Sequence, residues 1–260
     1  MGIEDNQLAR EAVLARVRAA LGREGPDDEA RAAAHAYLAA RVQGPRPAPP
    51  DDLVQRFQER ATDMSSTVER IASLDGVPTA VARYLGARGA GRMSAATAAT
   101  PAREQADAAD AARLEVAGAV LVDDPMKRGA AASSGVCWPE FAGLDWMGAG
   151  LAVEARPTTG NDALGITGCY CAIAETGTLV FVTGADTPSA TFLLPETHVA
   201  VVRASRIVAG MEDAFARVRA EGGMPRAVNL VSGPSRTGDI EQTIVLGAHG
   251  PRYVHILLVD

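Results

Sequence analysis

Residues 198–233 read "HVAVVRASRIVAGMEDAFARVRAEGGMPRAVNLVSG", and this stretch decides the fold class. The β-branched run at 198–208 predicts a strand, 210–222 predicts a helix that ends at a glycine, and 227–233 predicts a second strand. A strand, a helix and a strand in succession are typical of a crossover connection between parallel strands.

The same alternation continues on both sides of this stretch. Residues 171–184, "CAIAETGTLVFVTG", predict two short strands around a glycine turn, and 116–124 predict a buried strand. Beyond residue 233 we expect a helix at 239–248 and a last strand at 253–260. Because the strands are apolar along their whole length, we predict an α/β fold with a mainly parallel sheet flanked by helices.

The first part of the chain has a different composition. Alanine, leucine and arginine recur at 5–21 and 27–42 and predict two helices, after which "GPRPAPPDD" (44–52) brings four prolines. We therefore predict an N-terminal helical extension with a Pro-rich linker at 1–50 and an α/β domain at 51–260. At the start of that domain we expect helices at 51–61, 66–74 and 76–89. We assign no structure to 125–170.

Composition excludes several classes of function. The formal charge is −7 with no Lys/Arg cluster, so the chain offers no surface typical of nucleic-acid binding. No apolar run is long enough to span a membrane and the N-terminus lacks a signal-peptide pattern, so we expect a cytoplasmic protein without a membrane span.

The cysteines and histidines indicate no built-in metal chemistry. Three cysteines without a C-x-x-C cannot supply the four thiolates of an iron–sulfur cluster, and no histidine pair has H-x-x-x-H spacing. Cys169 and Cys171 are two residues apart, so on a strand they would face the same side. They could have a redox or metal role, or they could simply be small buried side chains, and we favour the second interpretation. His198 and His255 are expected to be packed or at a strand edge.

The loop "SGPSRTGDIE" (232–241) is the first candidate site. Glycines such as Gly233 let backbone amides approach a ligand, and Arg236 can fork onto a carboxylate or phosphate. An anion site would also use Ser235, Thr237 and Asp239. The alternative is a capped turn in which Asp239 is the helix N-cap.

The loop "AETGTLV" (174–180) is the second candidate. Glu175 at a turn could be a nucleophile, a general base or a hydroxyl binder, with Thr176, Gly177 and Thr178 orienting a ligand. The alternative, which we favour from the residues alone, is an acid that accepts hydrogen bonds from turn amides.

The loop "AHGPR" (248–252) is the third candidate. His249 beside Gly250 could carry a proton or contact a ligand, and Arg252 could pair with an anion. A histidine at a helix C-terminus is otherwise explained by the helix dipole. The 232–241 loop follows a predicted strand and should lie at its carboxyl end, where ligands usually bind in α/β folds. We expect the three loops to meet at one end of a common sheet.

Taken in order, three blocks resemble a known family. "AIAETGTLVF", "LLPETHVAVVRASRIV" and "SGPSRTGDIEQTIVLGAHGPRYVHILLVD" look like signature blocks of the lactate-utilization protein C family (LutC/YkgG), whose defining unit is the LUD domain. The resemblance is specific over about 165–260. The family often has an acid near the position of Cys171, whereas "CYCAIAETGT" has no acid before Glu175.

The resemblance implies a fold similar to the NagB/RpiA/CoA-transferase superfamily. It also implies a part in oxidising L-lactate to pyruvate, alongside an iron–sulfur protein and a second cysteine-rich subunit. The chain itself would then have no intrinsic cofactor, and the iron–sulfur clusters would belong to partner subunits.

Three hypotheses about function follow. In the first, the chain is the non-iron–sulfur subunit of a lactate-oxidising complex and binds a small carboxylate or other anion across the loops at 175–178, 233–239 and 249–252. Arg236 would bind the carboxylate, and Glu175 or His249 would handle a proton. In the second, it is an acyl or CoA transferase with Glu175 as nucleophile. In the third, it is a ligand-binding subunit without chemistry of its own.

Overall fold

The computed structural model describes residues 3–22, 27–97, 119–120, 134–222, 225–238, 244–247 and 249–260. The chain divides into two compact units, Met1–Ala48 and Pro49–Asp260. None of the described helices is long and apolar enough to cross a membrane.

The first unit consists of two helices, α1 (Ile3–Ala20) and α2 (Asp28–Ala40), as predicted. Helix α2 begins after Asp27, whose side chain accepts a hydrogen bond from the Ala30 amide at 2.9 Å. Leu8, Val17 and Leu38 are among the apolar side chains of this unit that are exposed.

The second unit is built on a six-stranded sheet in which every neighbouring pair of strands is parallel. This result confirms the α/β class. Strands β8 and β13 are the longest and lie at its centre, where their β-branched and leucine side chains are buried on both faces. In spatial order the strands are β1 (Thr67–Ile71), β13 (Tyr253–Val259), β8 (Thr197–Arg203), β5 (Leu164–Gly168), β3 (Ser134–Cys137) and β4 (Ala152–Ala155).

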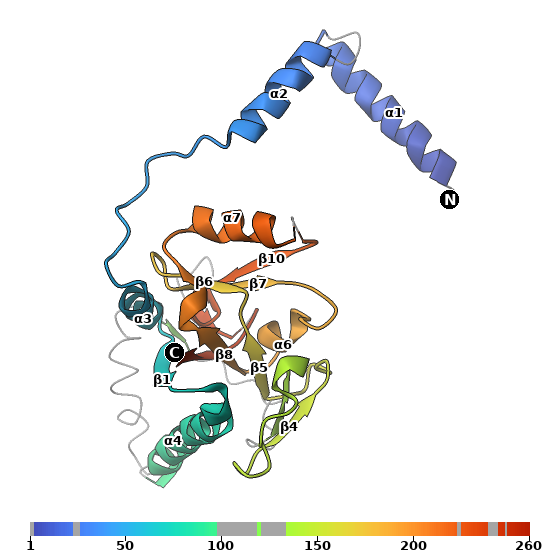
Figure 1. Ribbon diagram of the computed structural model, residues 1–260. Helices are drawn as coiled ribbons and strands as arrows, with labels where there is room; N and C mark the ends of the chain where they lie inside the picture. The colour runs from blue at the N-terminus through green and yellow to red at the C-terminus, as the bar shows by residue number, and fades with distance from the viewer. Residues whose placement is uncertain are drawn as a thin grey trace. The chain divides into compact units, whose positions relative to one another are not determined.

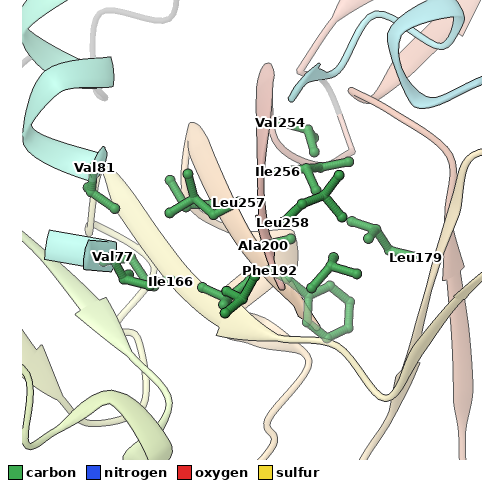
Figure 2. Close-up of a cluster of buried hydrophobic side chains, with 14 of the residues drawn as sticks. Val77, Val81, Ile166, Leu179, Phe192, Ala200, Val254, Ile256, Leu257 and Leu258 are labelled. Carbon is green, nitrogen blue, oxygen red and sulfur yellow. The ribbon is translucent and has the colours of Figure 1, made fainter. Parts of the chain in front are cut away.

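Alternate side chains of β13 enter two separate layers of core. On one side, Leu257 lies with Ile166 and with the α4 side chains Val77 and Val81 (Figure 2). On the other side, Ile256 faces Leu179 of a second sheet (Figure 2). Helix α4 (Val77–Thr97) and the second sheet therefore cover opposite faces of the six-stranded sheet (Figure 1).

The second sheet has four strands in the order β10-β7-β6-β9, and helix α7 lies over it (Figure 1). Strands β6 and β7 form an antiparallel hairpin, β10 pairs antiparallel to β7, and β6 pairs parallel to β9. A small third sheet has the order β11-β12-β2. The elements of these two layers are β6 (Cys171–Ile173), β7 (Thr178–Val182), β9 (Ile207–Val208), β10 (Val228–Val231), α7 (Met211–Glu221), β11 (Arg236–Gly238), β12 (Ile244–Leu246) and β2 (Ala119–Val120).

The remaining described elements are short or connect the layers. Helix α3 (Leu53–Asp63) begins at Asp52, whose side chain accepts hydrogen bonds from the amides of Val54 and Gln55. The others are η1 (Leu74–Gly76), η3 (Pro139–Phe141), α6 (Ala190–Leu193) and η4 (Ala204–Arg206).

Three of the predicted elements differ from the structure. The helix predicted at 66–74 is wrong: Thr67–Ile71 is strand β1, held by its parallel register with β13. Of the helix predicted at 239–248, residues 244–246 are strand β12, and 239–243 and 248 lie outside the described residues. The strand predicted at 198–208 is broken by η4. In each case partner strands decide the outcome, because short apolar runs fit either period.

Candidate functional site

The candidate loops gather at the amino edge of the six-stranded sheet, where β1, β13 and β8 begin at Thr67, Tyr253 and Thr197. Residues 249–252 immediately precede β13 and so lie at the amino end of that strand. The loop 232–235 does follow the carboxyl end of a strand, β10, but that strand belongs to the four-stranded sheet. The site is therefore a junction between two sheets.

The 174–177 hairpin loop packs against the end of helix α3. Gly177 has φ of 66°, and a Cβ there would lie 2.3 Å from the backbone nitrogen of Ala61, so this contact requires glycine. The Glu175 backbone is also fixed, because its amide donates to the Ala209 carbonyl at 3.1 Å and its carbonyl accepts from Arg60 Nε at 3.2 Å. The Glu175 side chain is half-buried.

A row of hydroxyl groups joins this hairpin to the loop after β10. Thr178 Oγ1 lies 2.7 Å from Thr176 Oγ1 and 2.7 Å from Ser232 Oγ. Thr178 is buried, whereas Thr176 and Ser232 are exposed. The row thus extends from the core to the surface beside Glu175.

Gly233 brings the next part of the loop against the same helix end. Its φ is 80°, and a Cβ there would lie 2.1 Å from the Met64 carbonyl oxygen. Ser235 then connects to the third loop: its amide donates to the Pro251 carbonyl at 2.9 Å, and its Oγ accepts from the His249 amide at 3.3 Å. The predicted loops 232–236 and 249–251 are therefore in direct contact.

The end of α3 supplies a residue that the sequence did not indicate. Ser65 has φ of 67°, and the amides of Ser65 and Ser66 donate to the carbonyls of Thr62 and Ala61, which is a Schellman pattern with serine where glycine is usual. Arg236 Nη2 donates to Ser65 Oγ. No local sequence signal marks a serine in this conformation.

The predicted site residues are only partly assembled. Within the described part of the chain, the Arg236 guanidinium donates to Ser65 Oγ and makes no hydrogen bond or ion pair with Glu175. Arg252 Nη1 lies 4.0 Å from Glu196 Oε1. Thr237 lies in β11 opposite Val245, Gly250 packs on Ser235, and Asp239 is outside the described residues.

The two strand histidines are packed, as predicted, and are uncharged at neutral pH. Burial lowers the pKa of His198 to about 3 and that of His255 to about 4. His198 Nε2 lies 2.8 Å from Thr167 Oγ1, and the His255 ring stacks on Tyr84 with the ring centroids 4.0 Å apart. Both rings are therefore neutral parts of the core.

The cysteines and carboxylates give no sign of a metal centre in the described ranges. No group of three or more His, Cys, Asp or Glu side chains there could hold a metal ion. Burial raises the pKa of Cys137 and of Cys171 to about 11 and also raises that of Cys169, so these thiols are protonated at neutral pH.

An open depression lies elsewhere, on the outer side of α3. Its volume is about 470 Å³, and none of the predicted site residues is among the residues that line it: Gln55, Gln58, Glu59, Thr62 and Asp63.

Comparisons with known proteins agree with the resemblance of the signature blocks. The family model described as the LUD domain matches residues 54–259. An uncharacterized protein of Neisseria meningitidis is 38% identical over 38% of this chain and 43% of its own. "Lactate utilization protein C" of Shouchella clausii is 35% identical over 37% of this chain and 44% of its own. "Lactate utilization protein C" of Bacillus subtilis is 38% identical over 37% and 42%.

The matched region thus spans less than half the length of these curated relatives. Among solved structures, a DUF162 family protein from Deinococcus radiodurans has a TM-score of 0.45 and 21% sequence identity, over 80% of this chain and 96% of that one.

Proposed function

Since the chain belongs to the LUD domain family, we propose that it takes part in lactate utilization and binds a small carboxylate at the junction of the 174–178, 232–236 and 249–252 loops. Relatives that carry the name "Lactate utilization protein C" support the pathway. A fold alone does not assign an activity, so the support for a small carboxylate ligand comes from the side chains at the junction.

The observation that carries this proposal is the state of Arg236. Its guanidinium is exposed and is held by a neutral acceptor, Ser65 Oγ, and no carboxylate of the described residues lies within ion-pair distance. A guanidinium has five N–H donors in a planar fork. Arg236 therefore keeps both its charge and most of its donors for a carboxylate.

The surrounding groups suit a 2-hydroxy acid. The exposed hydroxyls of Thr176 and Ser232 can hydrogen-bond the substrate hydroxyl, and Glu175 and His249 are the residues proposed to handle a proton. Oxidation of lactate to pyruvate releases two protons and two electrons. We propose that the electrons pass to an iron–sulfur protein and a cysteine-rich subunit, because the three cysteines of this sequence cannot ligate a four-thiolate cluster.

Isothermal titration of the full chain with L-lactate tests the carboxylate site. We expect Arg236→Ala to weaken binding by about tenfold to a hundredfold, the range for losing a charge-assisted bidentate contact. Arg236→Lys should recover only part of it. Arg226→Ala is the matched control, because Arg226 is also exposed but lies before β10. Equal affinity in Arg236→Ala and the wild type would contradict the proposal.

Glu175 supports a second candidate function, acyl transfer, because its backbone is rigidly held while its carboxylate remains partly exposed. In this reaction the carboxylate attacks an acyl-CoA thioester, CoA leaves as thiolate, and a mixed anhydride forms. Attack by the CoA thiolate on the glutamyl carbonyl of the anhydride then forms a glutamyl thioester and releases the acyl group as a carboxylate.

Mass spectrometry separates these candidates. A covalent adduct on Glu175 after incubation with acyl-CoA, absent in Glu175→Gln, would favour acyl transfer. Lactate binding with no adduct, together with retention of an iron–sulfur protein in a pulldown, would favour the lactate role. Intact lactate oxidation by an Arg236→Ala, Glu175→Ala variant of the assembled complex would assign the chain a non-catalytic role.

A further inference from the structure

A second arginine stands at the same amino edge, on the face of the sheet that α4 covers. Arg88 of α4 donates from Nη1 to Thr197 Oγ1 at 2.9 Å, and its guanidinium carbon lies 3.3 Å from the centre of the Tyr253 ring. Thr197 and Tyr253 are the first residues of β8 and β13 and are direct partners in the parallel register. Arg88 is thus fixed on two sides where two central strands begin.

The charge of Arg88 is not balanced by a carboxylate among the described residues. Other arginines of this domain do have such partners: Arg83 pairs with Glu69, and Arg206 lies 2.9 Å from Glu221. Arg88 instead contacts neutral groups: the Thr197 hydroxyl, the face of the Tyr253 ring, and Tyr84, whose ring centre lies 5.7 Å from the guanidinium carbon. Stacking on an aromatic face leaves the N–H edge of the guanidinium able to bind an anion.

The surroundings of Arg88 keep it accessible and rigid. Arg88 as a residue is half-buried. Tyr84, which lies beneath it, is itself stacked on His255 with an interplanar angle of 5°. A guanidinium fixed in this way loses little conformational entropy when an anion binds.

We propose that Arg88, Thr197 and Tyr253 form an oxyanion-binding site, which takes a carboxylate or phosphate group. Arg88 donates to the hydroxyl of Thr197 in β8, and Arg236 donates to the hydroxyl of Ser65 in the turn before β1. Strand β13 lies between β8 and β1 in the sheet. Two strand spacings are roughly 10 Å. The site is built from residues other than those of the Arg236 junction, so it stands whether or not Arg236 binds lactate.

Isothermal titration of the full chain with inorganic phosphate, and in parallel with acetate, tests this site and distinguishes the two sources of the anion. We expect Arg88→Met, which keeps much of the apolar stem, to weaken binding of the preferred anion by about tenfold or more. Arg226→Ala, which changes an exposed arginine before β10, should leave that binding unchanged. If Arg88→Met leaves the binding of both anions unchanged, this proposal is overturned.

Chemical footprinting of individual arginines uses only the wild-type chain, so its result does not depend on whether a variant folds. Phenylglyoxal modifies accessible arginines, and peptide mass spectrometry reports each one separately. We expect phosphate or acetate to protect Arg88 at least fivefold while the exposed Arg226 reacts at an unchanged rate. Unchanged modification of Arg88 at saturating concentrations of both anions would overturn the site.

Discussion

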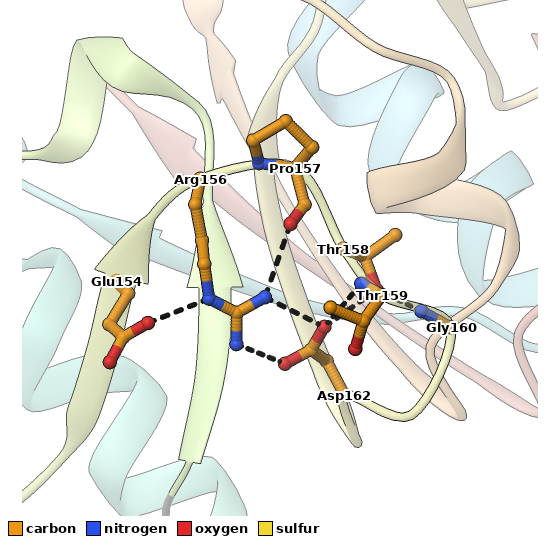
Figure 3. Close-up of polar contacts among 7 residues, drawn as sticks. All are labelled: Glu154, Arg156, Pro157, Thr158, Thr159, Gly160 and Asp162. Atoms are coloured by element: carbon orange, nitrogen blue, oxygen red, sulfur yellow. Dashed lines mark hydrogen bonds and ion pairs between the residues drawn. The ribbon is translucent and has the colours of Figure 1, made fainter.

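Two arginine environments in the α/β domain differ in how the charge is satisfied. In the loop between β4 and β5, Arg156 makes a two-pronged contact with Asp162 at 2.7 and 3.1 Å, and its Nε donates to Glu154 at 2.6 Å (Figure 3). At the amino edge, Arg236 and Arg88 are held by the hydroxyls of Ser65 and Thr197.

The difference separates the structural Arg156 from the two arginines that we propose to bind an anion. The Asp162 carboxylate accepts hydrogen bonds from both Nη atoms of Arg156, so fewer N–H donors remain for a ligand. It also raises the pKa of the Arg156 guanidinium. Neutral hydroxyls orient a guanidinium without neutralising it, so the amino edge keeps a positive charge that a ligand can balance. The loop thus fastens the chain, whereas the amino edge is suited to binding.

The largest expected effect tests how closely the amino edge is packed. Gly233→Ala should lower the free energy of unfolding by about 3 kcal/mol, because the new Cβ meets the Met64 carbonyl and φ is positive. Gly160→Ala, in the β4–β5 loop, has a positive φ of 91° but its nearest neighbour is 4.0 Å away, so about 1 kcal/mol is expected. Urea unfolding measures both, and equal losses would contradict the tight junction.

The next effect tests Arg156, the arginine of the β4–β5 loop that is paired with carboxylates. Asp162→Asn should lower the free energy of unfolding at pH 7 by about 1–2 kcal/mol, because Asp162 also accepts from Thr158 Oγ1 at 2.7 Å and the Thr159 amide at 3.1 Å. Urea unfolding against Asp186→Asn, which changes an exposed acid, provides the comparison. Equal stability of the two variants would mean that the loop contributes nothing.

The same pair predicts a pH dependence. The Arg156 guanidinium beside Asp162 lowers the pKa of that carboxyl to about 2, from an ordinary value of 3.8. A depressed folded-state pKa stabilises the fold above the unfolded pKa, so this contribution should be lost as the pH falls from about 4 to about 2. As the pH falls through that window, the midpoint temperature of thermal unfolding should decrease less steeply in Asp162→Asn than in the wild type.

The smallest effect tests the arginine anchor itself. Ser65→Gly should raise the free energy of unfolding by about 0.5 kcal/mol, since glycine relieves the left-handed backbone, yet weaken lactate binding because Arg236 loses its acceptor. Ser65→Ala keeps the strain and should be less stable than the glycine variant. Urea unfolding with lactate titration checks both readouts. Unchanged binding in Ser65→Gly would show that Arg236 needs no anchor.

Much of the fold was predictable because its signals are local. The strands at 228–231 and 253–259, the 171–182 hairpin and helix α7 follow from β-branched runs, a glycine turn and a helix ending at Gly222. Thr67–Ile71 could not be identified as a strand in this way, because its conformation depends on pairing with β13. Thr67 pairs with His255, which lies 188 residues later in the chain.

For the candidate site, the sequence alone determined which side chains offer chemistry: the glycines that permit close approach, the arginine of the "GPSRT" segment and the turn-held Glu175. Only the tertiary structure decided where they lie, at an amino edge between two sheets, and which neighbours complete them. Ser65, Arg88 and Thr197 act through contacts between residues distant along the chain. Such contacts depend on strand register and helix docking, which no local pattern specifies.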